Sequence, residues 1–146
     1  MGREIRFTLY EKPLAQKRHR RNGNRTYDPS ATAKKYVGFM IKQYTENYAS
    51  LNEHLLCGPI EVTMNFYMPM PRTKAARKKK GMYHTSKPDI DNLFKFYSDV
   101  MTGIIYADDA YICKINVTKY NSDTTRTEII VKEILQEPIP NIELKH

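Results

Sequence analysis

The sequence predicts an α/β (α+β) fold of two layers, with a mixed sheet built in the order β-α-β-α-β-β. Strict apolar–polar alternation, clearest in residues 60–68, is typical of half-buried strands, and apolar positions three or four residues apart, as in residues 90–104, are typical of helices. With 146 residues the chain is long enough for one domain with a normal core. We place this domain at residues 1–137 and expect a flexible carboxyl-terminal tail at 138–146.

The first half of the chain reads as strand, basic segment, helix and strand. Residues 4–10 alternate as in a strand. Asp28-Pro29-Ser30 is typical of a helix start capped by Asp28 or Ser30, and apolar residues then recur at helical spacing up to about residue 51. The stretch 72–86 has no periodicity and indicates a mobile loop, although its alanines also permit a short helix over 73–80.

The predicted helix at 90–104 is apolar on two neighbouring faces. A helix on the surface of a single layer needs only one apolar stripe, so this one is expected to be buried on two sides, either deep in the domain or at a dimer interface. Its remaining polar stripe consists of Asp91, Lys95 and Asp99, spaced four residues apart.

Two strands are expected after this helix. Residues 111–120 alternate, with Cys113, Ile115 and Val117 facing inward, and residues 125–135 follow after a turn at 121–123. The short turn predicts that the two strands form a carboxyl-terminal hairpin.

The net charge of +8 is concentrated in two segments, 17–25 and 72–80, which hold no acidic residue. Outside them acidic residues outnumber basic ones. Two basic arms on a mildly acidic body are typical of binding to a phosphate backbone, whereas solvated loops are the plain alternative. The candidate DNA-binding residues are Lys17, Arg18, Arg20, Arg21, Arg25, Arg72, Lys74, Arg77, Lys78, Lys79, Lys80 and Lys87.

Nothing in the sequence indicates a membrane or a disulfide framework. No stretch approaches the roughly 20 apolar residues that span a bilayer, and the amino terminus has no apolar signal region. The two cysteines, Cys57 and Cys113, lack metal-binding spacing. We therefore expect a cytoplasmic protein with reduced thiols, no membrane partner and no organic cofactor.

The chemistry is expected at Asp89 and Asp91, which flank Ile90 at the start of the second helix. Carboxylate oxygens of this kind suit Mg²⁺ or Mn²⁺. A second pair, Asp108-Asp109, completes the cluster only if the next strand returns beside Asp89. Such a site, with Lys95 one helical turn away, favours metal-assisted hydrolysis of phosphodiesters.

Each of these residues also has an ordinary structural explanation. Asp91-Asn92 can cap the helix, Asp108-Asp109 can be turn residues, and Lys95 can form a surface ion pair with Asp91 or Asp99. These alternatives stay open on the residues alone.

The segment Lys87-Pro-Asp-Ile-Asp-Asn-Leu-Phe-Lys95, followed by Asp99, Gly103 and Tyr106-Ala-Asp-Asp-Ala-Tyr-Ile112, resembles the signature of the RusA-type Holliday junction resolvases. The resemblance is sharp over residues 86–117 and weaker at Pro13 and 27–30. It implies a RusA-like fold. It also implies that Asp89, Asp91 and Asp109 are metal ligands, that Asp108 is a further candidate ligand, and that Lys95 is the catalytic lysine.

The same resemblance implies a homodimeric bacterial or prophage endonuclease that resolves four-way junctions in DNA recombination and repair. Its cofactor would be Mg²⁺, with Mn²⁺ able to substitute. Two alternatives remain at this point: a nucleic-acid-binding module without catalysis, and a metal-dependent nuclease that acts on another branched substrate, a single strand or RNA.

Overall fold

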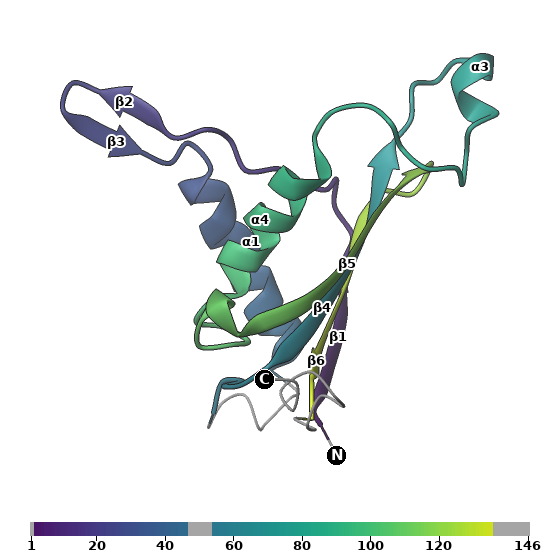
Figure 1. The fold of residues 1–146 in the computed structure, drawn as a ribbon. Coiled ribbons are helices and arrows are strands. Elements are labelled where there is room, and N and C mark those ends of the chain that lie inside the picture. The colour runs from purple at the N-terminus through teal and green to yellow at the C-terminus, as the bar shows by residue number, and fades with distance from the viewer. Residues whose placement is uncertain (1, 47–53, 136–146) are drawn as a thin grey trace, which may run out of the picture.

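The computed structural model describes residues 2–46 and 54–135 and consists of a mixed sheet with helices against it (Figure 1). The strands are β1 (Glu4–Leu9), β2 (Arg20–Asn22), β3 (Arg25–Tyr27), β4 (Ile60–Pro69), β5 (Ile112–Ser122) and β6 (Arg126–Glu133). The helices are α1 (Ala31–Thr45), α3 (Lys74–Arg77) and α4 (Ile90–Met101), with a 3₁₀ turn, η1, at Asp109–Tyr111. The mixed sheet and the two long helices are as predicted. Residues 47–51 of the expected first helix and the expected tail at 138–146 lie outside the described residues.

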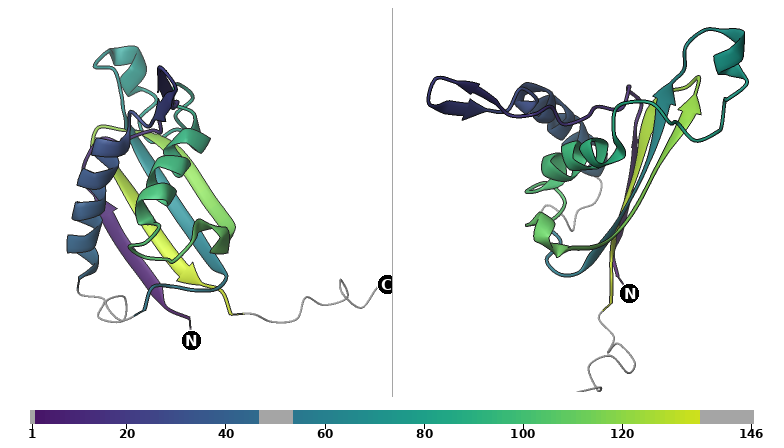
Figure 2. Two further views of the ribbon diagram at one scale, coloured as in Figure 1. Left: turned by 90° about the vertical axis from the view of Figure 1, so that its left-hand side faces the viewer. Right: turned by 45° about the horizontal axis from the view of Figure 1, so that its top comes forward.

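The main sheet has the strand order β1-β6-β4-β5, and both long helices cover the same face of it (Figure 2). Strand β4 pairs antiparallel with β6 and parallel with β5. Strands β5 and β6 are therefore not neighbours, and the expected carboxyl-terminal hairpin is wrong. The physical reason is that α4 serves as the crossover between two parallel strands, which leaves the other edge of β4 for β6.

The core lies between this sheet and the helices. Every second residue of β4 faces the helices and is at most 1% exposed, and these residues are Ile60, Val62, Met64, Phe66 and Met68. The apolar faces of α1 and α4 pack on them through buried residues that include Val37, Ile41, Leu93, Phe96 and Met101. The strict alternation of β4 in the sequence thus marks the central strand of the sheet.

Helix α4 is buried on two sides within its own chain. Tyr97, on its second apolar face, is 2% exposed, and its hydroxyl group accepts a hydrogen bond from the backbone nitrogen of Leu14. On the other side α1 comes so close that a Cβ atom added at Gly38 would lie 3.3 Å from Cδ1 of Ile104. Of the two explanations for the doubly apolar helix, burial deep in the domain is the right one.

Cys113 and Ile115 were expected to face inward, but neither is buried, because β5 is an edge strand that the helices cover only in part. Ile115 pairs with Val62 and so faces the helix side, yet it is 49% exposed. Val117, further along the strand, packs against the core. Cys57 and Cys113 are both free and exposed.

None of the helices in the described part of the chain is long and apolar enough to cross a membrane.

Candidate active site

The amino-terminal end of α4 presents two carboxylates that are not used to cap the helix. Asp89 occupies the N-cap position in an extended conformation, and its side chain makes no capping hydrogen bond. The alternative in which Asp91 or Asn92 is the cap is therefore wrong. The carboxylate of Asp91 is exposed and, among the described residues, accepts a hydrogen bond only from the backbone nitrogen of Asn92, at 2.9 Å.

Both carboxylates line one open cavity of about 630 Å³, which we call the carboxylate cavity. Its other walls come from α4 itself, from β5 and from the segment before α4, and include Tyr83, His84, Val117, Thr118 and Lys119. Asp89 accepts a hydrogen bond from the ammonium group of Lys87 at 2.8 Å. That bond and charge, with a smaller contribution from Lys119, hold the pKa of the Asp89 carboxyl below its usual range.

Lys119 is a residue of this cavity that the sequence analysis missed. Its Nζ atom donates hydrogen bonds to the backbone oxygens of Ser86 and Pro88, each at 2.9 Å, and so holds the segment that carries Asp89 against β5. Lys119 pairs with the fully buried Phe66 and thus stands on the helix-facing side of the strand. A lysine at an inward position of an alternating strand is the signal that could have identified it.

The segment between α3 and α4 is not the structureless loop that was expected. Residues 81–84 run along the end of β5, where the backbone nitrogens of Gly81 and His84 donate to the oxygens of Asn121 and Lys119, at 2.9 and 3.0 Å. The ring of Tyr83 stacks on Tyr120 at 5.7 Å between centroids. The alternative of a short helix within 73–80 is correct for Lys74–Arg77, which Thr73 caps through its hydroxyl group.

The second acidic pair lies at the opposite end of α4. This helix has 12 residues and is thus about 18 Å long. Because β5 runs parallel to β4, it begins beside the carboxyl-terminal end of α4, close to Asp109, and reaches the level of Asp89 only at Lys119. The expected cluster of Asp89, Asp91 and Asp109 is therefore not formed within one chain, and no group of three or more Asp, Glu, His or Cys among the described residues can hold a metal ion.

The remaining acidic candidates divide between structural and exposed positions. Asp108 is a turn residue, as the plain alternative proposed, because its carboxylate accepts a hydrogen bond from the backbone nitrogen of Ala110 at 2.9 Å. Asp109 is exposed. Lys95 is exposed and forms no ion pair with Asp91 or Asp99 in the described part of the chain.

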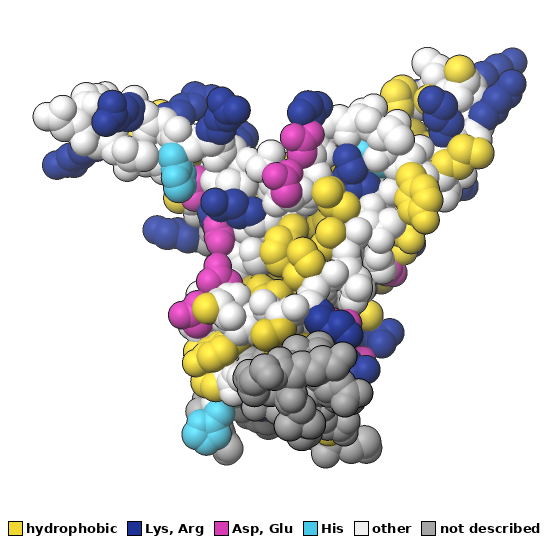
Figure 3. Space-filling model, viewed as in Figure 1, with side chains coloured by type: hydrophobic (Ala, Val, Ile, Leu, Met, Phe, Trp, Pro, Cys, Tyr) yellow, Lys and Arg dark blue, Asp and Glu magenta, His cyan; other side chains and the backbone are white. Residues whose placement is uncertain are grey.

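The basic segments form two arms that extend on either side of the amino-terminal end of α4 (Figure 1). The first arm is the β2–β3 hairpin, and the second is the segment around α3. In Figure 3 lysine and arginine side chains cover both arms, with acidic groups in the concave region between them. The hairpin strands were not predicted, because three-residue strands of Arg, Asn, Thr and Tyr have no apolar alternation. The turn between them contains Gly23, with φ of 66°.

Asp28 anchors the base of the hairpin arm. Its carboxylate accepts hydrogen bonds at 2.8 Å from Lys34 of α1, from the side chain of Gln16 and from the backbone nitrogen of Ser30. Lys34 also contacts Asp99 of α4 at 3.2 Å. The bond from Lys34 is the main cause that lowers the pKa of Asp28 far below its usual range.

A comparison with known protein families adds to this geometry. The family model described as "Endodeoxyribonuclease RusA" matches residues 11–132. The chain belongs to the RusA family. An uncharacterized protein of Bacillus subtilis (strain 168), YqaN, is 33% identical over 143 residues, which cover 89% of this chain and 96% of that protein. The crossover junction endodeoxyribonuclease rusA of Lactococcus phage r1t is 31% identical over 77 residues, which cover 52% of this chain and 56% of that protein.

Membership of the RusA family makes this chain an endodeoxyribonuclease, an enzyme that hydrolyses phosphodiester bonds of DNA. The alternative of a binding module without catalysis is thereby excluded. RusA nucleases depend on a metal ion, and the exposed carboxylates of Asp89 and Asp91 are the hard oxygen ligands that Mg²⁺ or Mn²⁺ prefers. Two carboxylates can contribute ligands to such an ion, with the remaining ligands coming from outside this pair.

We expect the substitution Asp28→Asn to destabilise the protein by about 1 kcal/mol at neutral pH, because it removes a charged partner of Lys34. The pKa of Asp28 is lower in the folded than in the unfolded chain, so its contribution is fully present above about pH 5. It is lost as the pH falls through the folded pKa. Urea unfolding of both proteins between pH 7 and pH 3 should therefore show a difference that shrinks toward acid pH. A difference that grows would contradict this assignment.

Proposed function

We propose that this RusA-family nuclease is a Mg²⁺-dependent resolvase that cuts four-way DNA junctions by paired phosphodiester hydrolysis, in recombination and repair. One observation carries the proposal: two exposed carboxylates share a cavity at the base of a concave surface, between two cationic arms. An acidic site flanked by cations is suited to a polyanion that is held by its phosphates while one phosphodiester bond is cut.

The two arms suit a branched substrate better than a straight duplex. They extend in different directions from one end of the sheet and leave the acidic site between them (Figures 1 and 3). Contacts from lysine and arginine to phosphates recognise the shape of the backbone and carry little sequence information. We assign the backbone contacts to the basic residues of segment 17–25, which contains most of the β2–β3 hairpin, to those of segment 72–80 around α3, and to Lys87.

A second copy of the chain would complete the metal site. Asp109 lies near the start of β5 and the carboxylate cavity near its end, so two β5 strands that pair antiparallel would bring Asp109 of one copy to the cavity of the other. The edge of β5 over residues 112–117 has no neighbouring strand in the described part of the chain, and Ile115 is exposed there. A twofold dimer of this kind contains two equal sites, one for each strand to be cut.

The residues of each site then have distinct roles. Asp89 and Asp91 from one copy and Asp109 from the other would hold Mg²⁺, with Asp108 as a further candidate, and Mn²⁺ would substitute. The bound ion would polarise a phosphate oxygen and favour ionisation of a water molecule. Lys95 is placed one turn from Asp91 to stabilise negative charge that develops on the phosphate. Lys119 holds the backbone on which Asp89 is mounted.

We expect Asp91→Asn to lower junction cleavage about 100-fold or more, because it removes a ligand charge while leaving the fold intact. Binding of the junction, measured without metal by gel shift, should remain close to that of the wild type. The matched control is Asp123→Asn, which makes the same change at an exposed ion pair with Lys80 outside the carboxylate cavity. The control should cut normally.

The substrate is tested by cleavage of a four-way junction, a flap and a linear duplex with the wild-type enzyme at one salt concentration. A resolvase cuts the junction fastest and in opposed strands. Equal rates on junction and duplex would refute the resolvase assignment, and a flap cut fastest would favour the alternative of a nuclease for other branched DNA.

We expect Lys119→Met to lower kcat by about 10- to 100-fold, because two charge-assisted hydrogen bonds to the backbone before Asp89 are lost. The KM for the junction should change little, since the basic arms are untouched. Lys119→Arg, which keeps the charge and donors, should restore part of the rate. Lys132→Met, at an exposed position of β6, is the control, and an equal loss there would show that Lys119 has no special role.

A further inference from the structure

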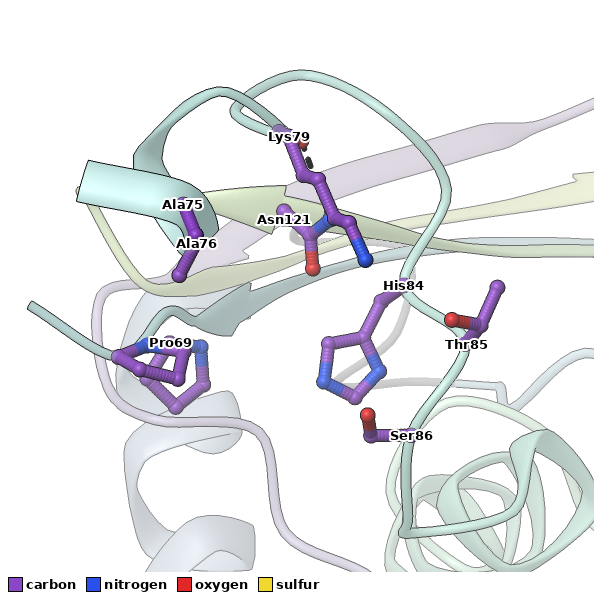
Figure 4. A pocket seen from close by; sticks show the side chains of 9 residues that line it. Pro69, Ala75, Ala76, Lys79, His84, Thr85, Ser86 and Asn121 are labelled. Atoms are coloured by element: carbon purple, nitrogen blue, oxygen red, sulfur yellow. Dashed lines mark hydrogen bonds between the residues drawn. The ribbon is translucent and has the colours of Figure 1, made fainter. Parts of the chain in front are cut away.

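A second cavity, of about 280 Å³, lies between α3 and the ends of β4 and β5 (Figure 4). We call it the α3 pocket. Four apolar residues, Pro69, Pro71, Ala75 and Ala76, form one wall of it. The opposite side carries polar groups from the segment before α4 and from β5. This pocket was not predicted from the sequence, and the proposed metal site does not use it. Of the residues assigned above to backbone contacts, Lys79 is also part of its lining.

The polar side of the α3 pocket offers hydrogen-bonding groups but little charge. Asn121 donates its amide nitrogen to the backbone oxygen of Lys79 at 3.1 Å, which leaves the amide oxygen for the pocket (Figure 4). The side chain of Lys79 is the single cation of the lining, and Thr85 and Ser86 add hydroxyl groups.

His84 connects this pocket with the catalytic site, because it lines both the α3 pocket and the carboxylate cavity. Its backbone is fixed to Lys119, and its Nδ1 atom is buried without a hydrogen-bond partner in the described part of the chain. In Figure 4 the imidazole ring and Pro69 lie on opposite sides of the pocket. Burial, and then the charge of Lys119, lower the pKa of His84, so the ring is neutral at physiological pH.

We infer that the α3 pocket receives one unpaired nucleobase of the DNA strand that passes through the carboxylate cavity. A nucleobase is flat and apolar on its faces and has hydrogen-bonding groups at its edge, and this pocket has an apolar wall, a planar imidazole ring and an amide acceptor. A phosphate group would instead require several cations or backbone donors, and the lining has one lysine. The inference rests on the proposed function, because a distorted junction supplies an unpaired base beside the cut.

Such a pocket would give the enzyme a base preference next to the scissile phosphate. Because stacking of a base on planar side chains is tolerant of sequence, the amide of Asn121 and the side chain of Lys79 would supply the discrimination between bases. The other basic residues of the arms contact only the backbone, so the base preference would come from the few polar residues of the α3 pocket, while most of the affinity would come from the arms.

The experiment combines a protein variant with a modified substrate. A series of junctions is prepared in which each nucleotide that flanks the cut is replaced in turn by an abasic site. For each junction, kcat/KM is measured with the wild type and with the Ala76→Leu variant. This substitution narrows the pocket without a change in charge. With the wild type, removal of the base at one position should cost about tenfold. On the intact junction, kcat/KM of the Ala76→Leu enzyme should be lower than that of the wild type by a similar factor. Removal of the base at that position should then cause no further loss for this variant. Ala31→Leu, an exposed alanine at the start of α1, should behave like the wild type.

Two results would overturn the inference. In the first, removal of a base lowers kcat/KM at no position. In the second, the losses from Ala76→Leu and from base removal multiply when the two changes are combined. A loss caused by a neutral methylphosphonate linkage and not by base removal would show instead that the pocket takes a phosphate. If Ala76→Leu unfolds, Ala75→Leu, at a more exposed position of the same wall, replaces it. The same substrates are also compared for binding without metal, so the pocket is tested even if no junction is cut and the proposed function fails.

Discussion

The arrangement of the carboxylate cavity depends on the ammonium group of Lys119, which holds the backbone before α4 against the end of β5. Through these two hydrogen bonds the sheet sets the position of Asp89 at the start of α4. The same stretch of β5 fixes residues 81–84, and with them the α3 pocket. Lys119, which is partly buried, thus fixes the positions of the acidic site, the α3 pocket and the second basic arm relative to the sheet.

The parallel pairing of β4 and β5 has a second consequence, which is that one chain cannot assemble the acidic cluster. The helix between two parallel strands returns the chain to the starting end of the sheet, so residues before and after that helix lie about its full length apart. Asp89 and Asp109 are separated in this way. For the proposed resolvase, which would cut two strands together, a site divided between two copies would have a physical advantage, because a monomer would hold no complete site and could not cut one strand alone.

The sequence predicted the helices and strands whose periodicity comes from burial. It did not predict the strand order or the role of Lys119, because contacts between distant parts of the chain determine both. The alternation of β4 and the two apolar faces of α4 were sufficient to place both elements. The spacing of Asp89 and Asp91 predicted that their carboxylates lie together, and they line one cavity. The positions of β5 and β6 on either side of β4 were missed, because a short turn favours a hairpin and no local signal opposes it. Lys119 was missed for a similar reason: its two acceptors are backbone oxygens about 30 residues away, which leave no local pattern.

In the proposed dimer, the metal site takes Asp91 from one copy and Asp109 from the other. The most direct test mixes the variants Asp91→Asn and Asp109→Asn, each inactive alone, under conditions in which subunits exchange. In a mixed dimer with divided sites, one site carries both substitutions and the other carries none, so nicking of one junction strand should return. If each site were built within one chain, both sites of the mixed dimer would keep a substitution. Mixtures that stay as inactive as the separate variants, with exchange verified, would contradict the claim.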